Sequence, residues 1–141
     1  MRLRRTKRIL QIEDLKDDPE ILNNYAWNLF YAGEHEKSLR IAKSAYDLSD
    51  SNPYIGDTLG WIMVNDSGSR EEGVRILKDS YEQSNQHPEI VYHLAFGLKH
   101  SGEFLAAKEL LDTLLENKDE FDSRESAKKL LGEINKELKQ G

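Results

Sequence analysis

The sequence of 141 residues contains no cysteine and no apolar run that approaches the length of a membrane-spanning helix. Without cysteine, disulfides, thiolate nucleophiles and cysteine-based zinc or iron–sulfur sites are excluded. Without about 20 consecutive apolar residues, membrane insertion is not expected. The apolar stretch that follows the basic residues 2–8 is too short for a secretory signal. We therefore expect a cytoplasmic protein, or a periplasmic or envelope-associated one if the sequence is an excerpt of an exported protein.

Motifs of catalysis are also missing. The sequence has no G-x-S-x-G, no phosphate-binding loop and no H-E-x-x-H. Paired acids such as Glu71-Glu72 fall where helices are expected to begin, and acids there complement the helix dipole. Two histidines, His93 and His100, share one helical face, but seven residues of helix separate them by about 10 Å. A single metal ion cannot bind both across that gap. The sequence therefore predicts no enzyme, no cofactor and no metal site.

Positive charge is concentrated at the start of the chain. Residues 1–8 carry five of the 20 lysines and arginines and no acid, so the remaining residues hold 15 basic side chains against 26 acidic ones. Acidity of this kind repels a phosphate backbone, and nucleic acid is not an expected partner. We interpret residues 1–18 as a basic extension with a short helix that covers the first repeat, or as the tail of a preceding repeat. A basic arm for anionic lipid or nucleic acid is the alternative.

Three glycines mark an internal repeat. Gly33, Gly68 and Gly102 recur at intervals of 35 and 34 residues, and each separates two amphipathic helical patterns. Aligned through these glycines, the sequence predicts three helix–turn–helix repeats over residues 19–52, 53–87 and 88–121. A last amphipathic helix over 122–141 is expected to cap the array, because the final repeat would otherwise expose its apolar side.

This spacing resembles the tetratricopeptide repeat family. With the glycines aligned, a small residue recurs inside the first helix as Ala26 and Ala95, and Trp61 stands at that place in the middle repeat, next to Gly60. The small residue that opens the second helix is Ser38 in the first repeat, Gly73 in the second and Ala107 in the third. The resemblance implies an all-α fold, a right-handed α-solenoid of antiparallel helix pairs. Residues 22–27, 57–61 and 88–95 further resemble the terminal repeats of bacterial envelope and export-associated members.

In the family, the first helix of each repeat lines the concave face of the array. The resemblance therefore implies a partner-binding groove made of Asn23, Trp27, Phe30, Tyr31, Thr58, Ile62, Asn65, Tyr92, Phe96, Lys99 and His100. Several of these are aromatic, and aromatic side chains with a polar group are favoured anchors at protein interfaces. The Lys, Arg and Asn side chains with which some members hold a C-terminal carboxylate are missing from the matching positions, so recognition of an acidic chain end is not expected.

These observations predict a non-catalytic interaction module that binds a peptide or a helix of another protein in its groove. Two alternatives remain at this stage. Some of the aromatic residues could instead pack under the basic extension or the terminal helix. The chain could also be a structural, self-associating segment of a longer scaffold, which would make it a homo-oligomer.

Overall fold

A computed structural model describes residues 18–140, and within that range all the regular structure is helical. The predicted all-α class is confirmed. The basic extension predicted for the start of the chain lies, apart from Asp18, outside the described residues. The helices are α2 (Pro19–Tyr31), α3 (His35–Leu48), α4 (Pro53–Val64), α5 (Arg70–Gln83), α6 (Pro88–His100), α7 (Phe104–Glu116) and α8 (Arg124–Gln140).

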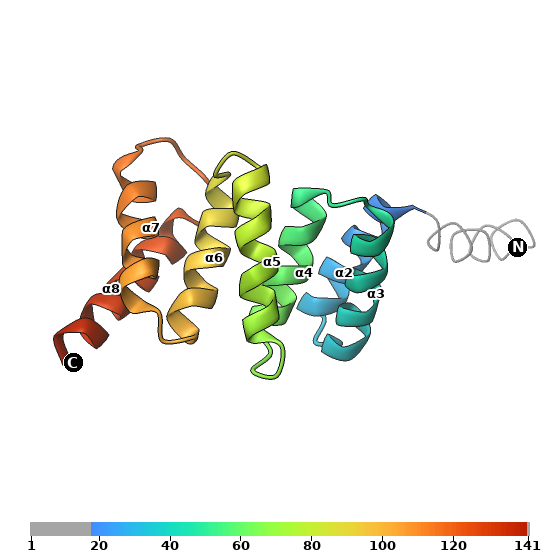
Figure 1. Ribbon diagram of the computed structural model, residues 1–141, viewed down its shortest axis with the longest axis horizontal. Helices are drawn as coiled ribbons and strands as arrows, with labels where there is room; N and C mark the ends of the chain where they lie inside the picture. Colours follow the sequence, from blue (N-terminus) through green and yellow to red (C-terminus); the bar gives the residue numbers. More distant parts are fainter. Residues whose placement is uncertain (1–17, 141) are drawn as a thin grey trace, which may run out of the picture.

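The helices form two rows along the long axis of the molecule (Figure 1). Consecutive helices pack as pairs, α2 with α3, α4 with α5 and α6 with α7. The first helices of successive pairs also contact one another, α2 with α4 and α4 with α6, whereas among the described residues α3, α5 and α7 do not. The array of helix pairs therefore bends towards the row of α2, α4 and α6, and this row forms its inner face. Helix α8 contacts α6 and α7 and extends the inner row by one helix.

Each inner helix from α2 to α6 begins with a capping side chain followed by a proline. Asp18, Asn52 and His87 accept hydrogen bonds from the backbone N–H groups of the first turn, at 2.8–3.3 Å. Pro19, Pro53 and Pro88 follow at the first helical position, where the missing N–H costs nothing because no helical carbonyl could accept it. These three prolines therefore fix where the inner helices start.

Small residues hold the two helices of each pair close together. The Ser38 hydroxyl is buried and donates to the carbonyl of Ala26 at 2.7 Å. In the next pair, a methyl group built on Gly60 would stand 3.2 Å from the carbonyl oxygen of Gly73. In the third pair the matching residues are the fully buried Ala95 and Ala107. Gly60 in α4 and Gly73 in α5 are thus explained by the close approach of the two backbones.

In the second pair, residues 53–66 occupy repeat positions that differ by one residue from those predicted by aligning the three glycines. The turns between α2 and α3 and between α6 and α7 have three residues each, with Gly33 and Gly102 in the left-handed conformation at φ of 89° and 83°. The turn between α4 and α5 spans residues 65–69, and its Gly68 does not adopt a positive φ. Instead the Asp66 carboxylate closes this turn by accepting from the Gly68 N–H and the Ser69 hydroxyl. Gly68 is therefore not the structural equivalent of the other two glycines.

Candidate functional site

A hollow of about 560 Å³ opens on the inner face of the array. Three inner helices, α2, α4 and α6, and the segment that leads into α8 form its walls. We call it the inner hollow, and its lining residues are Asn23, Asn24, Trp27, Tyr31, Asp57, Thr58, Trp61, Glu89, Tyr92, His93, Asp122, Ser123 and Ser126. Five of them belong to the groove that the sequence predicts, namely Asn23, Trp27, Tyr31, Thr58 and Tyr92.

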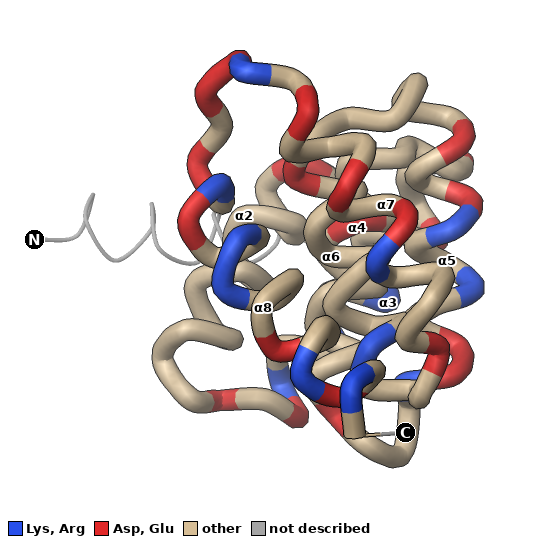
Figure 2. The backbone as a smooth tube through the Cα atoms, turned by 90° about the vertical axis from the view of Figure 1, so that its left-hand side faces the viewer, with Lys and Arg blue, Asp and Glu red and all other residues tan. Residues whose placement is uncertain are grey.

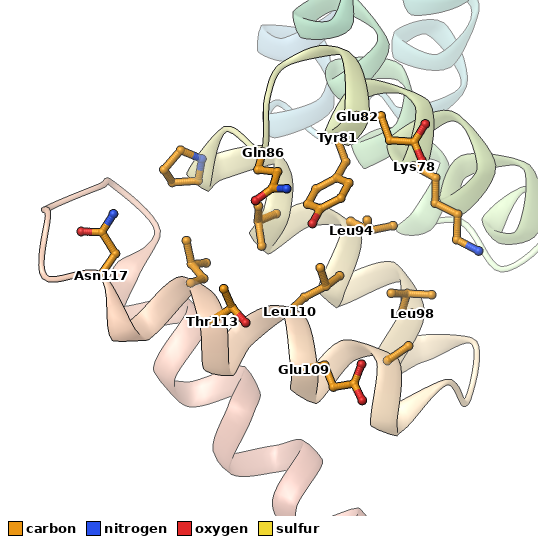
Figure 3. A pocket seen from close by; sticks show the side chains of 14 residues that line it. Lys78, Tyr81, Glu82, Gln86, Leu94, Leu98, Glu109, Leu110, Thr113 and Asn117 are labelled. Carbon is orange, nitrogen blue, oxygen red and sulfur yellow. The ribbon is translucent and has the colours of Figure 1, made fainter.

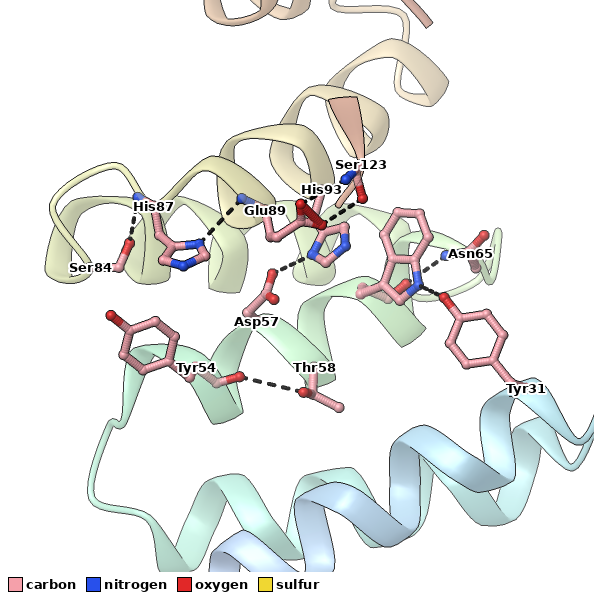
Figure 4. A network of polar contacts seen from close by, with 11 residues as sticks. Tyr31, Tyr54, Asp57, Thr58, Asn65, Ser84, His87, Glu89, His93 and Ser123 are labelled. Atoms are coloured by element: carbon pink, nitrogen blue, oxygen red, sulfur yellow. Dashed lines mark hydrogen bonds and ion pairs between the residues drawn. The ribbon is translucent and has the colours of Figure 1, made fainter. Parts of the chain in front are cut away.

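Trp61 is the centre of the aromatic wall of the hollow. Its side chain is only 8% exposed and stacks on His93, with ring centroids 4.3 Å apart and an angle of 28° between the planes. The centroid of the Phe96 ring lies 4.8 Å from that of Trp61, with an angle of 60° between the planes. The indole N–H donates to the Tyr31 hydroxyl at 3.1 Å (Figure 4). Tyr31 in turn contacts Trp27 at 5.0 Å. One aromatic layer therefore runs from α2 through α4 to α6.

A histidine–aspartate pair lies beside this wall. The Nδ1–H of His93 donates to Asp57 Oδ1 at 2.6 Å, and the two side chains are 7% and 14% exposed (Figure 4). Because a carboxylate can only accept, this bond places a proton on Nδ1. Among the described residues Nε2 has no hydrogen-bond partner. The pair thus holds the imidazole in one orientation at the wall of the hollow.

The segment before α8 is fixed to α6 by Glu89. Its carboxylate accepts from the Ser123 N–H at 2.9 Å and from the Ser123 hydroxyl at 2.5 Å. This double hydrogen bond keeps the end of the loop, including Asp122, at the rim of the inner hollow.

Burial raises the pKa of the neighbouring Tyr92 above its ordinary value, so its phenol is neutral at physiological pH.

The remaining predicted groove residues lie elsewhere. Ile62 is buried in the core with Ala26 and Met63. The Asn65 side chain donates to the Trp61 carbonyl at 2.8 Å, and with Phe30 and Ile62 it lines a smaller hollow of about 290 Å³.

The last predicted positions are near the C-terminal end of α6. The rings of Phe96 and His100 pack 4.3 Å apart, and Lys99 lies between them in sequence. Burial lowers the pKa of His100 below its ordinary value of 6.5, and the charges of Lys99 and Arg70 lower it further. His100 is therefore neutral at pH 7.

The sequence reasoning missed Asp57, Trp61 and His93, and a signal for two of them was present. When each helix is counted from its proline, the fifth residue of α2, α4 and α6 is, in that order, Asn23, Asp57 and Tyr92. The ninth residue is, in the same order, Trp27, Trp61 and Phe96. Alignment through the glycines instead placed Thr58 and Ile62 at these positions. The prolines give the correct phase because they fix the start of the helices whose side chains line the hollow.

The described part of the chain offers no cluster of three or more His, Asp or Glu side chains that could hold a metal ion. In the same range, no helix combines the length and the apolar character needed to cross a bilayer.

No protein-family model and no curated protein matches the sequence. The fold is similar to the type III secretion chaperone SycD of Yersinia enterocolitica in complex with a peptide of the translocator YopD, at 21% identity and a TM-score of 0.68 over 86% of this chain and 94% of that one. An alternative dimer of SycD gives 20% and 0.70 over 85% and 93%. A type III secretion system (T3SS) complex from Aeromonas hydrophila gives 16% and 0.71 over 87% and 84%. At these identities the similarity shows the tetratricopeptide-like fold alone.

Proposed function

We propose that the chain is a non-catalytic interaction module that binds a peptide segment of another protein in the inner hollow. The observation that carries this proposal is the hollow itself, in which partly exposed aromatic rings from α2 and α6 face hydrogen-bonding groups that lack partners. Trp27 and Tyr92 are partly buried and Tyr31 is 60% exposed, so a ligand could cover all three rings. Large aromatic side chains of this kind carry much of the binding energy at protein interfaces.

An unpaired acceptor in the hollow supports an ordered, polar contact with a peptide. Asn23 Oδ1 is buried and has no hydrogen-bond partner in the described part of the chain. His93, whose Nε2 has no hydrogen-bond partner among the described residues, lines the same hollow. A buried polar atom without a partner costs about 1–3 kcal/mol, so a ligand that supplies an N–H recovers that cost. The SycD structure with a YopD peptide gives a precedent in the same fold for a bound peptide.

Replacing both Trp27 and Tyr92 with alanine is expected to weaken peptide binding at least 30-fold. Loss of an interface hot spot costs about 2 kcal/mol or more, and 1.4 kcal/mol is a factor of ten in affinity. Peptides are first selected against the unmodified chain from a random display library. Their dissociation constants are then measured for both proteins by isothermal titration calorimetry, with circular dichroism as a check that the variant is folded.

The control variant is Tyr54→Ala, which removes a tyrosine that is 52% exposed and lies outside the inner hollow. It should bind the selected peptides with unchanged affinity. The proposal fails if the library yields no binder, or if the selected peptides bind the double variant as tightly as the unmodified chain.

Self-association is the second candidate function, and an apolar hollow on the other side of the array supports it. This outer hollow of about 580 Å³ lies between α5, α6 and α7, with Leu94, Leu98 and Leu110 on its walls (Figure 3). Leu105 of α7 is 66% exposed as well. Sedimentation equilibrium over a series of concentrations tests this candidate. A mass that rises towards that of a dimer supports it, and a constant monomer mass excludes it.

A further inference from the structure

From the lining of the inner hollow we infer that it receives a basic side chain of the bound peptide, with arginine favoured over lysine. The inference rests on the proposed function and specifies the chemistry of the ligand. Three of the lining residues are acids, Asp57, Glu89 and Asp122, and none is lysine or arginine. Residues 18–140 as a whole carry 14 basic against 23 acidic side chains. The hollow is thus acidic within an acidic array.

The acids reach the hollow from different elements. Asp57 lies on α4, Glu89 on α6, and Asp122 on the loop that leads to α8. Figure 2 shows that acidic positions recur along this loop. Since a compact site surrounded by carboxylates raises the local concentration of cations, a basic side chain is attracted before it makes any direct contact.

The aromatic wall is the second feature that suits a cation. Trp27, Tyr31, Trp61 and Tyr92 come together there, with ring centroids 5.0 Å apart for Trp27 and Tyr31 and 5.9 Å for Trp61 and Tyr92. A cation that lies over such a ring is attracted by the negative face of the π system, most strongly for tryptophan. A guanidinium can also stack on aromatic rings because it is planar, and this favours arginine over lysine.

Hydrogen-bonding capacity is the third feature that suits a basic side chain. Asn23 Oδ1 is a buried acceptor without a partner among the described residues. A guanidinium has five N–H donors and no acceptor, so it can donate to this oxygen. A donated N–H would remove the cost of leaving this buried acceptor without a partner.

The chain has only two tryptophans, and both line the inner hollow, so their indole signals report on this site alone. The probe is N-acetyl-arginine amide, followed by the two indole N–H resonances in ¹H–¹⁵N NMR spectra. We expect a saturable shift of both resonances. The citrulline counterpart, which has nearly the same shape but no charge, should bind at least tenfold more weakly. Equal responses to the two compounds would overturn the inference.

A matched pair of variants tests the role of charge. Asp122→Asn removes one carboxylate from the rim of the hollow and should weaken binding of N-acetyl-arginine amide about two- to fivefold, the usual effect of a partly exposed ion pair. Glu109→Gln removes one charge from the outer hollow and should leave this binding unchanged. Equal weakening by both variants, or by neither, contradicts a specific cation site.

The selected peptides separate this inference from the proposed function. If they contain an arginine whose replacement by citrulline weakens binding at least tenfold, the inference is supported. If they bind the hollow with no basic residue, or if the citrulline replacement has no effect, the inference fails and the proposed function stands. If the library yields no binder, the proposed function fails, and the indole titration alone decides whether the hollow binds arginine.

Discussion

Replacing Gly73 with valine should lower the free energy of unfolding by about 3 kcal/mol, near the upper end of the usual cost of overpacking. A methyl group at this position would stand 2.7 Å from the Met63 Cβ, 3.0 Å from the Gly60 carbonyl oxygen and 3.0 Å from Val64 Cγ1. Two of these three atoms, a backbone oxygen and a Cβ, are fixed by α4 itself. The clash can be relieved only if α4 and α5 move apart. Urea denaturation followed by circular dichroism measures the change.

Gly132→Ala is the matched control, because it also replaces a glycine inside a helix. Apart from its two chain neighbours and the backbone of its own helix, no atom of the described residues lies within 4 Å of the position that its Cβ would take. Alanine there should stabilise α8 by about 1 kcal/mol through its higher helix propensity. If Gly73→Val unfolds at the same urea concentration as the unmodified chain, the contact between α4 and α5 is looser than described.

Replacing Trp61 with alanine should lower the free energy of unfolding by about 4 kcal/mol, the usual cost of removing a buried tryptophan. This ring contacts His93, Tyr92 and Phe96 on α6, and its N–H bonds to Tyr31 on α2. Its loss would leave a cavity where three inner helices meet. The unfolding transition in urea gives the value. Should the variant prove too unstable to purify, Trp61→Phe, which retains a ring but loses the N–H bond, is expected to cost less than half as much.

Trp27→Ala tests whether the central position of Trp61 matters. Trp27 is only partly buried, and its ring centroid lies 5.0 Å from that of Tyr31 and 6.4 Å from that of His93, whereas the two nearest rings lie 4.3 Å and 4.8 Å from Trp61. Its removal should cost about 1–2 kcal/mol from the lost apolar contact. Equal losses of stability for the two alanine variants would show that Trp61 does not join the inner helices in the way proposed above.

The fold could be predicted from the sequence because its two main signals are local. Apolar residues at steps of three and four define each helix, and the recurrence near 34 residues defines the array. The repeat positions of the second pair were predicted one residue out of place because the turn between α4 and α5 is longer than the turns within the other two pairs. Gly68 stands in that turn, but Asp66 closes it with its side chain, so a glycine at this point no longer marks the same place in the structure. Pro53 would have marked it correctly.

The chemistry of the site was harder to foresee. His93 and Asp57 are 36 residues apart, and Glu89 and Ser123 are 34 apart. Both separations are close to the length of one repeat. Which side chains meet also depends on the angle between neighbouring helix pairs, and this angle cannot be predicted from the repeat length. Asp122 and Ser123 moreover lie between helices, where no periodic pattern applies. The sequence therefore indicated the face and some of its aromatic residues, but not the acids that give the hollow its charge.

The two-row arrangement has a consequence for how quickly the chain folds. Among the described residues, helices contact only the next one or two along the chain. Side-chain hydrogen bonds between different pairs, such as those of Tyr31 with Trp61 and of Asp57 with His93, span 30 and 36 residues. Forming each contact therefore requires the closure of a loop of about one repeat. Helical proteins, whose contacts are mostly local, typically fold within microseconds to milliseconds. Such an array can start from any pair and grow in either direction.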